Sequence, residues 1–182
     1  RAERLKFNIE RQDAAIVEVR VGDGKRPESF WKEYFDAVLL DAPCSGVGLF
    51  AVKDPQTYRG WSLKTVNRLA KEQRKLIEVA YETLKPGGAL VYSTCTLMKE
   101  ENEANIAWLL EKYGSQASLD KIDLILENGI TQPIRFDNQV NSALVIIPTE
   151  LYEGFFIAKL RKRPSENKAN PGGLPSSNSR NL

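Results

Sequence analysis

Two short apolar runs, separated by one long amphipathic stretch, constrain the fold of this chain more than any other feature of its sequence. The runs are Ala37–Leu40 and Ala89–Ser93, and the stretch between them repeats apolar side chains at helical spacing from Ser62 to Leu84. A short continuous apolar run is typical of a strand covered on both faces, and a helix that joins two such strands makes them parallel. We therefore expect an open α/β sheet in which residues 37–40 form a central strand.

Shorter elements are expected on both sides of this unit. The run Pro86-Gly87-Gly88 predicts the end of the long helix. The acidic residues Glu100, Glu101 and Glu103 favour the first turn of a second helix, because negative charge is stabilised at a helix N-terminus. The other expected elements are the end of a helix over 1–12, a strand over 14–21, the second helix from about 100 to 114, a candidate strand over 121–126 and a last strand over 154–160. Residues 127–150 show no pattern that favours one structure.

The length and composition indicate one domain with a polar tail. The chain has 182 residues, of which 42% are hydrophobic, and this is enough for one substantial core. No run approaches the roughly 20 apolar residues needed to cross a bilayer, and no secretory leader opens the chain, so we expect a cytoplasmic or organelle-matrix location. Residues 163–182 are almost free of apolar side chains and are expected to be disordered. Because Arg1 lies inside a helical pattern, we expect a piece of a longer protein.

The chain has no histidine and only two cysteines, which narrows its chemistry. Without histidine it lacks the usual general base and the commonest metal ligand, and two cysteines cannot form a four-thiolate zinc site or a disulfide framework. We expect no metal, and acid–base work would fall to Asp, Glu, Lys or Cys. A net charge of +2 neither indicates nor excludes a nucleic-acid partner.

Both cysteines, Cys44 and Cys95, follow directly after the predicted parallel strands. Open α/β sheets bind ligands at the carboxyl ends of their strands, so the two thiols are expected to share a site there. The alternative is that they are structural, because a free cysteine behaves as a small hydrophobic residue. A structural cysteine belongs inside an apolar run, whereas these two are surrounded by Pro, Ser, Thr and Gly. Two thiols at such an edge suit covalent catalysis.

Two aspartates are further candidates. Asp41 is the last residue of the first strand, where a carboxylate needs a partner, and a loop hydrogen bond would also explain it. Asp23 lies between Gly22 and Gly24, a composition that a turn alone would account for.

The chain resembles the Sun/RsmB family of RNA 5-methylcytosine methyltransferases in three stretches: Leu39–Gly48 (LLDAPCSGVG), Gly87–Asn105 (GGALVYSTCTLMKEENEAN) and Glu153–Lys162 (EGFFIAKLRK). The spacing of Lys53-Asp54-Pro55 and Gly60-Trp61-Ser62 is most similar to the RsmF-like branch, which modifies ribosomal RNA. The resemblance covers about residues 1–162 and implies the C-terminal part of a Rossmann-like class I methyltransferase domain. It also implies S-adenosylmethionine as cofactor and rRNA or tRNA as substrate.

The resemblance implies a role for each candidate residue. Cys95 would be the nucleophile that adds to C6 of cytosine, whereas DNA cytosine methyltransferases use the thiol of their Pro-Cys motif. Cys44 would help to release the methylated product. Asp41 would face the N3 and amino edge of the base, near the methyl donor, and Asp23 would hydrogen-bond the adenine of the cofactor. The target base would have to leave its stack to reach Cys95.

The chain departs from the family at its N-terminal side. The family's glycine-rich cofactor loop, its strand and the ribose-binding acidic residue should precede Arg1, and none is in the sequence. In this type of sheet the missing strands lie between strand 14–21 and strand 37–40, so the first would lose its neighbours. We expect the chain alone to fold poorly or rearrange, to bind the cofactor weakly and to be inactive.

Two alternatives remain open. One is a methyltransferase of the same fold that acts on DNA or protein, although N-methylation needs no covalent cysteine. The other is a catalytically degenerate RNA-binding or scaffold module. The retained residues Cys44, Cys95 and Asp41 argue against degeneracy, and the absent cofactor loop argues for it.

Overall fold

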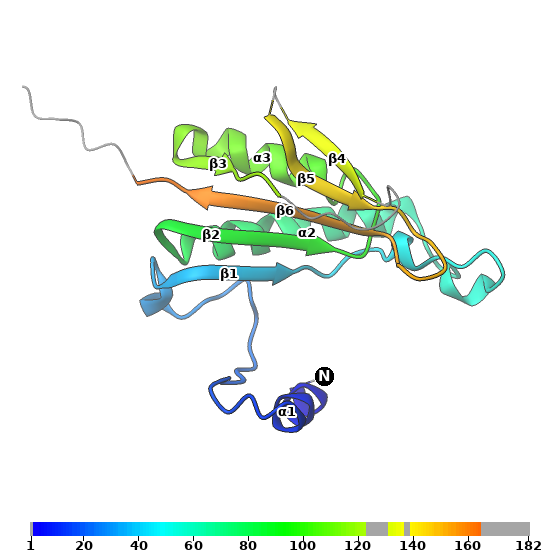
Figure 1. Ribbon diagram of the computed structural model, residues 1–182, viewed down its shortest axis with the longest axis horizontal. Coiled ribbons are helices and arrows are strands. Elements are labelled where there is room, and N and C mark those ends of the chain that lie inside the picture. The colour runs from blue at the N-terminus through cyan, green and yellow to red at the C-terminus, as the bar shows by residue number, and fades with distance from the viewer. Residues whose placement is uncertain (1, 123–130, 137–138, 165–182) are drawn as a thin grey trace, which may run out of the picture.

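A computed structural model describes residues 2–122, 131–136 and 139–164, which form a mixed six-stranded sheet with α2 and α3 behind it (Figure 1). The sheet order is β1-β2-β6-β5-β4, with β3 paired to β6. β1 and β2 are parallel, and the other pairs are antiparallel. The strands are β1 (Phe35–Asp41), β2 (Leu84–Thr94), β3 (Ala117–Leu119), β4 (Thr131–Phe136), β5 (Gln139–Ile146) and β6 (Phe155–Lys162). This confirms the expected α/β class.

The predicted strand–helix–strand unit is confirmed. Helix α2 (Leu63–Glu82) joins β1 to β2, and the Ser62 side chain caps it by accepting a hydrogen bond from the Thr65 N–H. An N-cap serine satisfies one of the otherwise unpaired N–H groups of the first turn. The helix ends before Pro86, as expected, but β2 already begins at Leu84 rather than at residue 89.

The core lies between the sheet and the two helices behind it. Helix α3 (Glu103–Tyr113) packs beside α2, and both contribute fully buried side chains. The rings of Tyr92 on β2 and Phe156 on β6 meet edge-on, with centroids 6.2 Å apart. Burying one large apolar side chain contributes about 1.5–3 kcal/mol, so such residues hold the sheet against the helices. The largest fully buried apolar side chains include Ile77, Leu84, Leu90, Ile106, Leu109 and Leu160.

The prediction of a strand over residues 14–21 is wrong. The segment has no strand structure, and its apolar side chains Ile16 and Val21 are 99% and 80% exposed. A strand is stable only when a neighbour pairs with its backbone, and no strand of the described sheet pairs with this segment. The helix predicted over 1–12 is present as α1 (Ala2–Arg11), which has no buried residue and lies apart from the sheet (Figure 1).

The prediction that residues 37–40 form a central strand covered on both faces is also wrong. Within the described residues β1 pairs only with β2, so it is the edge of the sheet. The Leu39 side chain is 71% exposed. A continuous apolar run predicts that both faces of a strand are buried, but other segments have to bury them. Within the described residues, one face of β1 stays exposed.

The C-terminal elements match the predictions in part. Helix α3 begins at Glu103 rather than near residue 100, so of the three expected first-turn acids only Glu103 is in the first turn. The last strand is confirmed as β6. The candidate strand over 121–126 extends into residues outside the description, as does the predicted disordered tail over 163–182; β3 lies just before residue 121. No helix in the described part of the chain is long and apolar enough to span a membrane.

Candidate active site

Two thiols meet where the parallel strands β1 and β2 end. The strand register pairs Asp41, the last residue of β1, with Ser93 near the end of β2. The loops that follow carry Cys44 and Cys95, whose Sγ atoms are 3.0 Å apart. Both side chains are half-buried. Residues 51 positions apart in the sequence are thus brought within hydrogen-bond distance at the edge of the sheet where open α/β folds bind ligands.

The surroundings of Cys44 determine its protonation state. Burial raises the pKa of the Cys44 thiol to about 12, and the hydrogen bond to Cys95 adds to the rise. Cys44 is therefore protonated at neutral pH, because a thiol ionises only near its own pKa. The protonated Cys44 sulfur thus lies within hydrogen-bond distance of the Cys95 sulfur.

Glycines hold the Cys44 loop close to the backbone of Cys95. The N–H of Gly48 donates to the Cys95 carbonyl at 3.0 Å, and the N–H of Gly154 donates to the Gly48 carbonyl at 2.8 Å. A Cβ on Gly48 would lie 2.0 Å from the Gly154 carbonyl oxygen, so only glycine fits there. Gly46 has φ of 71°, in the left-handed region that glycine enters at little cost. The loop is therefore tight and lies directly between Cys95 and Gly154.

A buried carboxylate that the sequence did not identify as functional holds the same loop. Glu101 has no exposed surface. Its Oε1 accepts hydrogen bonds from the Ser45 N–H at 3.0 Å and from Gln73 Nε2 at 2.9 Å, and its Oε2 accepts from Ser45 Oγ at 2.5 Å. Gln73 Nε2 also donates to the Pro43 carbonyl at 2.8 Å. The residues on both sides of Cys44 are thus fixed through Glu101 and Gln73.

Glu101 was expected to act as a first-turn acid of the second helix, and that expectation is wrong. The chain makes a turn over residues 99–102 before α3 begins, and this turn directs the Glu101 side chain into the interior. No periodicity could have identified its role, because its partners come from the Cys44 loop and from α2.

Hydrogen bonds also fix the turn that follows Cys95. Thr94 Oγ1 donates to Asn102 Oδ1 at 2.7 Å, and Asn102 Nδ2 donates to the Thr96 carbonyl at 2.8 Å. The hydroxyls of Ser45 and Thr96 are 3.0 Å apart, which links the two cysteine loops directly. Thr94, Thr96 and Asn102 thus belong to a buried polar network that restricts the conformation of Cys95.

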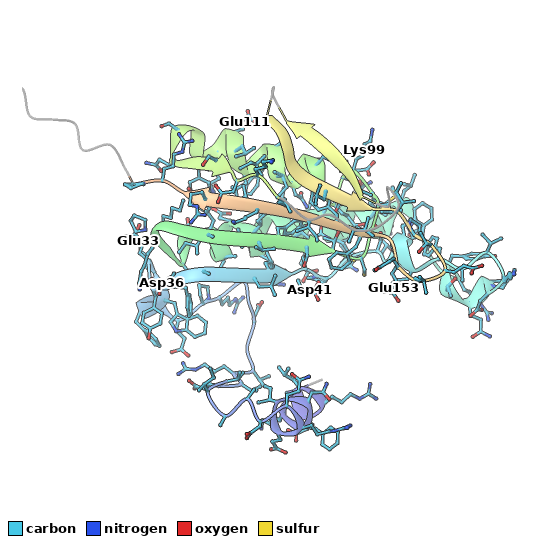
Figure 2. All side chains as sticks on the ribbon, viewed as in Figure 1. Glu33, Asp36, Asp41, Lys99, Glu111 and Glu153 are labelled. Carbon is cyan, nitrogen blue, oxygen red and sulfur yellow. The ribbon has the colours of Figure 1, made fainter. Side chains whose placement is uncertain are left out.

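Asp41 lies at the carboxyl end of β1, at the opposite end of the strand from Asp36 (Figure 2). Its side chain is exposed, so the burial cost that we expected there does not arise. Its Oδ1 accepts a long hydrogen bond of 3.4 Å from Ser93 Oγ. Asp41 is thus on the same sheet edge as the thiols, and its described contacts include neither sulfur.

The structure does not bring Asp23 to the two thiols. Its carboxylate accepts a hydrogen bond from the Lys25 N–H at 3.0 Å and lines a cavity of about 250 Å³. Trp31 and Thr83 are among the other lining residues, and neither cysteine is. Asp23 therefore lines a hollow that is separate from the two thiols.

Comparisons with known proteins agree on one family. The family model described as 16S rRNA methyltransferase RsmB/F matches residues 1–161. Ribosomal RNA small subunit methyltransferase F of Aeromonas salmonicida is 40% identical over 161 residues, which is 88% of this chain and 33% of that protein. The chain thus spans about a third of the length of the curated relatives that it matches.

Solved structures show the same likeness. The crystal structure of PH0851 matches with a TM-score of 0.74 and 34% identity, over 88% of this chain and 34% of that one. The crystal structure of NSun6 from Pyrococcus horikoshii with SFG matches with a TM-score of 0.68 and 29% identity, over 90% of this chain and 39% of that one.

Proposed function

This chain belongs to the 16S rRNA methyltransferase RsmB/F family, and from that premise we propose that it carries the catalytic thiols of an rRNA cytosine-C5 methyltransferase. The family and its class I methyltransferase fold, both expected from the sequence, are confirmed. Its members are S-adenosylmethionine-dependent RNA methyltransferases. The observation that carries the proposal is the 3.0 Å separation of Cys44 Sγ and Cys95 Sγ at the ends of adjacent parallel strands.

Cys95 acts as the nucleophile in this proposal. Water takes the Cys95 thiol proton, the resulting thiolate electron pair forms the S–C6 bond of a cytosine, and the electrons of the C5–C6 double bond make C5 a carbon nucleophile. Bound S-adenosylmethionine supplies the methyl group that C5 receives. Loss of the C5 proton then restores the double bond and expels the Cys95 sulfur. Asp41, exposed at the same sheet edge, faces the N3 side of the base and in this proposal donates a proton to N3, which neutralises the negative charge that the addition places on the ring.

Cys44 assists the release of the product. Because burial keeps Cys44 protonated, its S–H stabilises the negative charge on the Cys95 sulfur as the S–C6 bond breaks. A protonated Cys44 cannot itself accept the C5 proton, so water takes that proton. This division of labour agrees with the absence of histidine from the sequence.

The described residues include two carboxylates whose chemistry suits the cofactor. Asp23 offers a partly exposed carboxylate suited to an adenine amino group, and Asp41 lies near the reacting base. The cavity at Asp23 is about 250 Å³, below the roughly 300–1,000 Å³ typical of small-molecule sites. We propose that the chain alone binds S-adenosylmethionine weakly and does not transfer methyl groups by itself.

An RNA partner is supported by a basic stripe on the exposed face of α2. The stripe consists of Lys64, Arg68, Lys71 and Lys75, which recur at helical spacing and line a groove of about 720 Å³. Its three lysines have no ion-pair partner within the described residues. Unpaired cations in a row bind a phosphate backbone by releasing its counterions.

The function is tested by trapping the covalent adduct on a denaturing gel. The protein is extended at its N-terminus by the family's cofactor-binding region and mixed with S-adenosylmethionine and an rRNA fragment. We expect a protein–RNA adduct to accumulate with Cys44→Ala, because release is slowed, and none to form with Cys95→Ala.

The double variant Cys44→Ala/Cys95→Ala serves as the control for non-specific crosslinks. An adduct with Cys95→Ala would overturn the assignment of the nucleophile. If the extended protein binds the cofactor but no variant forms an adduct, the chain is the degenerate RNA-binding module instead.

A further inference from the structure

We infer that Glu101 is a positioning residue: its buried carboxylate fixes the loop around Cys44 so that the Cys44 S–H faces the Cys95 sulfur. The catalytic role of Glu101 rests on the proposed function, whereas its effect on the position of this loop does not. It gives a role to a second residue of the stretch Thr94–Glu103, in addition to Cys95.

The environment of Glu101 is unusual for a charged side chain. It has no exposed surface, and within the described residues no lysine or arginine forms an ion pair with it. A buried carboxylate without a counter-ion is costly, and only several hydrogen bonds to its oxygens offset that cost. Three of the donors are known: the Ser45 N–H, Ser45 Oγ and Gln73 Nε2. Two of the three come from the residue next to Cys44, so the carboxylate is directed at that loop.

Glu101 is itself held rigidly from other elements. Its carbonyl accepts hydrogen bonds from the Tyr92 hydroxyl at 2.6 Å and from Asn105 Nδ2 at 3.0 Å. Asn105 Nδ2 also donates to Gln73 Oε1 at 2.9 Å, which orients the Gln73 amide toward Glu101 and Pro43. Burial raises the pKa of Tyr92, so its hydroxyl remains a donor at neutral pH. Glu101 is therefore tied to β2 and α3 through its carbonyl and to α2 through its carboxylate.

This arrangement determines where the Cys44 sulfur lies. Pro43 and Ser45 are anchored through their carbonyl and N–H groups, and Cys44 lies between them. Without Glu101 the Ser45 anchor would be lost, and a shift of about 1 Å in a reacting group is enough to cost much of its catalytic effect. Loss of the anchor would also open Cys44 to solvent.

The test measures the reactivity of each thiol in the 182-residue chain. Wild type, Glu101→Ala and Glu101→Gln are treated with iodoacetamide at pH 8, and alkylation of Cys44 and Cys95 is followed separately by mass spectrometry. For Glu101→Ala we expect the Cys44 rate to rise about tenfold or more, because the thiol becomes exposed and ionises more readily, while the Cys95 rate changes less than about twofold.

Two further variants serve as a conservative replacement and as a control. Glutamine at 101 keeps an oxygen for the Ser45 N–H and Gln73, and its amide can donate to Ser45 Oγ, so Glu101→Gln should restore slow Cys44 alkylation to within about threefold of wild type. Glu100→Gln is the matched control, because Glu100 is an exposed neighbour, and it should leave both rates unchanged.

Circular dichroism of every variant separates repositioning from unfolding. An unchanged Cys44 rate in folded Glu101→Ala, or a parallel rise of both thiols, would overturn the inference. If Glu101→Ala does not fold, Ser45→Ala removes only one donor and should still raise the Cys44 rate selectively; no selective rise there would overturn it equally. Failure of the RNA adduct experiment would count against the proposed function and leave this result intact.

Discussion

At the residue scale, Cys44 and Cys95 show how two identical side chains come to lie in different surroundings. Burial keeps the proton on Cys44, and the loop places this thiol 3.0 Å from the Cys95 sulfur. Their positions after two strands made both thiols candidates. Only the folded structure shows the protonation of Cys44, because ionisation depends on desolvation and on neighbours from distant segments.

The raised pKa of Cys44 predicts a pH-dependent stability. Between its ordinary value of 9.0 and about 12, the unfolded chain loses the Cys44 proton while the folded chain keeps it. The contribution of the buried thiol is thus fully present below pH 9 and is lost as pH rises toward 12. We expect the free energy of unfolding of wild type, minus that of Cys44→Ala, to be constant from pH 7 to 8.5 and to fall from pH 9 to 10.5.

Urea unfolding at each pH measures this difference, and the subtraction removes the tyrosines, which titrate in both proteins. A difference that stays constant up to pH 10.5 would show that the folded state does not hold the Cys44 proton.

At the element scale, α2 presents two faces with separate tasks. Its buried face, including Val66, Leu69 and Ile77, packs against the sheet, and its exposed face carries the basic stripe. Both faces were implicit in the helical spacing, but the sequence did not show that Lys25 would join the stripe from a distant loop. Glu72 pairs with Lys25 and Arg68 at 3.2 and 3.3 Å, which leaves the other lysines available.

Replacing Lys64, Lys71 and Lys75 together by glutamine is expected to weaken RNA binding in a salt-dependent way. Each lost phosphate contact makes the slope of log K against log salt less negative by about 0.7 for a single strand, so the slope should become less negative by about 2. Fluorescence anisotropy of a labelled single-stranded RNA, titrated with the 182-residue chain over a series of salt concentrations, gives both slopes.

The matched control replaces three exposed lysines outside the stripe, Lys6, Lys32 and Lys85, by glutamine. It removes the same net charge and should change the slope by less than about 0.7, the value of one contact. Equal slopes for the two triple variants would mean that α2 does not bind the RNA backbone.

The elements also show where periodicity is informative. The helix over 63–82 and the strand over 155–162 were predictable because their apolar spacing and flanking residues agree with one structure. The hairpin of β4 and β5 was not, since residues 127–150 have no clear pattern and their pairing depends on β6. The strand expected over 14–21 did not form for the opposite reason: its sequence alternates apolar and polar residues, but no strand of the described sheet pairs with it.

At the scale of the whole molecule, the open edge of β1 accounts for the weak cofactor binding that we expect. One face of this strand is exposed at Leu39, and the small cavity at Asp23 is lined without Asp41 or the thiols. A cofactor held by both aspartates needs a surface that connects them. The chain covers 33% of its Aeromonas relative, and we propose that such a surface comes from residues outside the 182.

Isothermal titration calorimetry with S-adenosylmethionine tests this proposal. We expect the chain alone to bind at least about tenfold more weakly than an N-terminally extended protein, which corresponds to about 1.4 kcal/mol or more. Asp23→Asn in the extended protein should weaken binding, because the adenine amino group loses its charged acceptor. Equally tight binding by the short and extended chains would contradict the proposal.

The parallel strand–helix–strand unit, the family and the position of two thiols after two strands could all be predicted from the amino-acid sequence. These follow from local periodicity and short motifs, which act over a few residues. Only the folded structure shows that β1 is an edge of the described sheet, that the two sulfurs lie 3.0 Å apart and that Glu101 holds the Cys44 loop. Each of these depends on contacts between segments far apart in the chain, and burial, protonation and hydrogen-bond partners are set by those contacts.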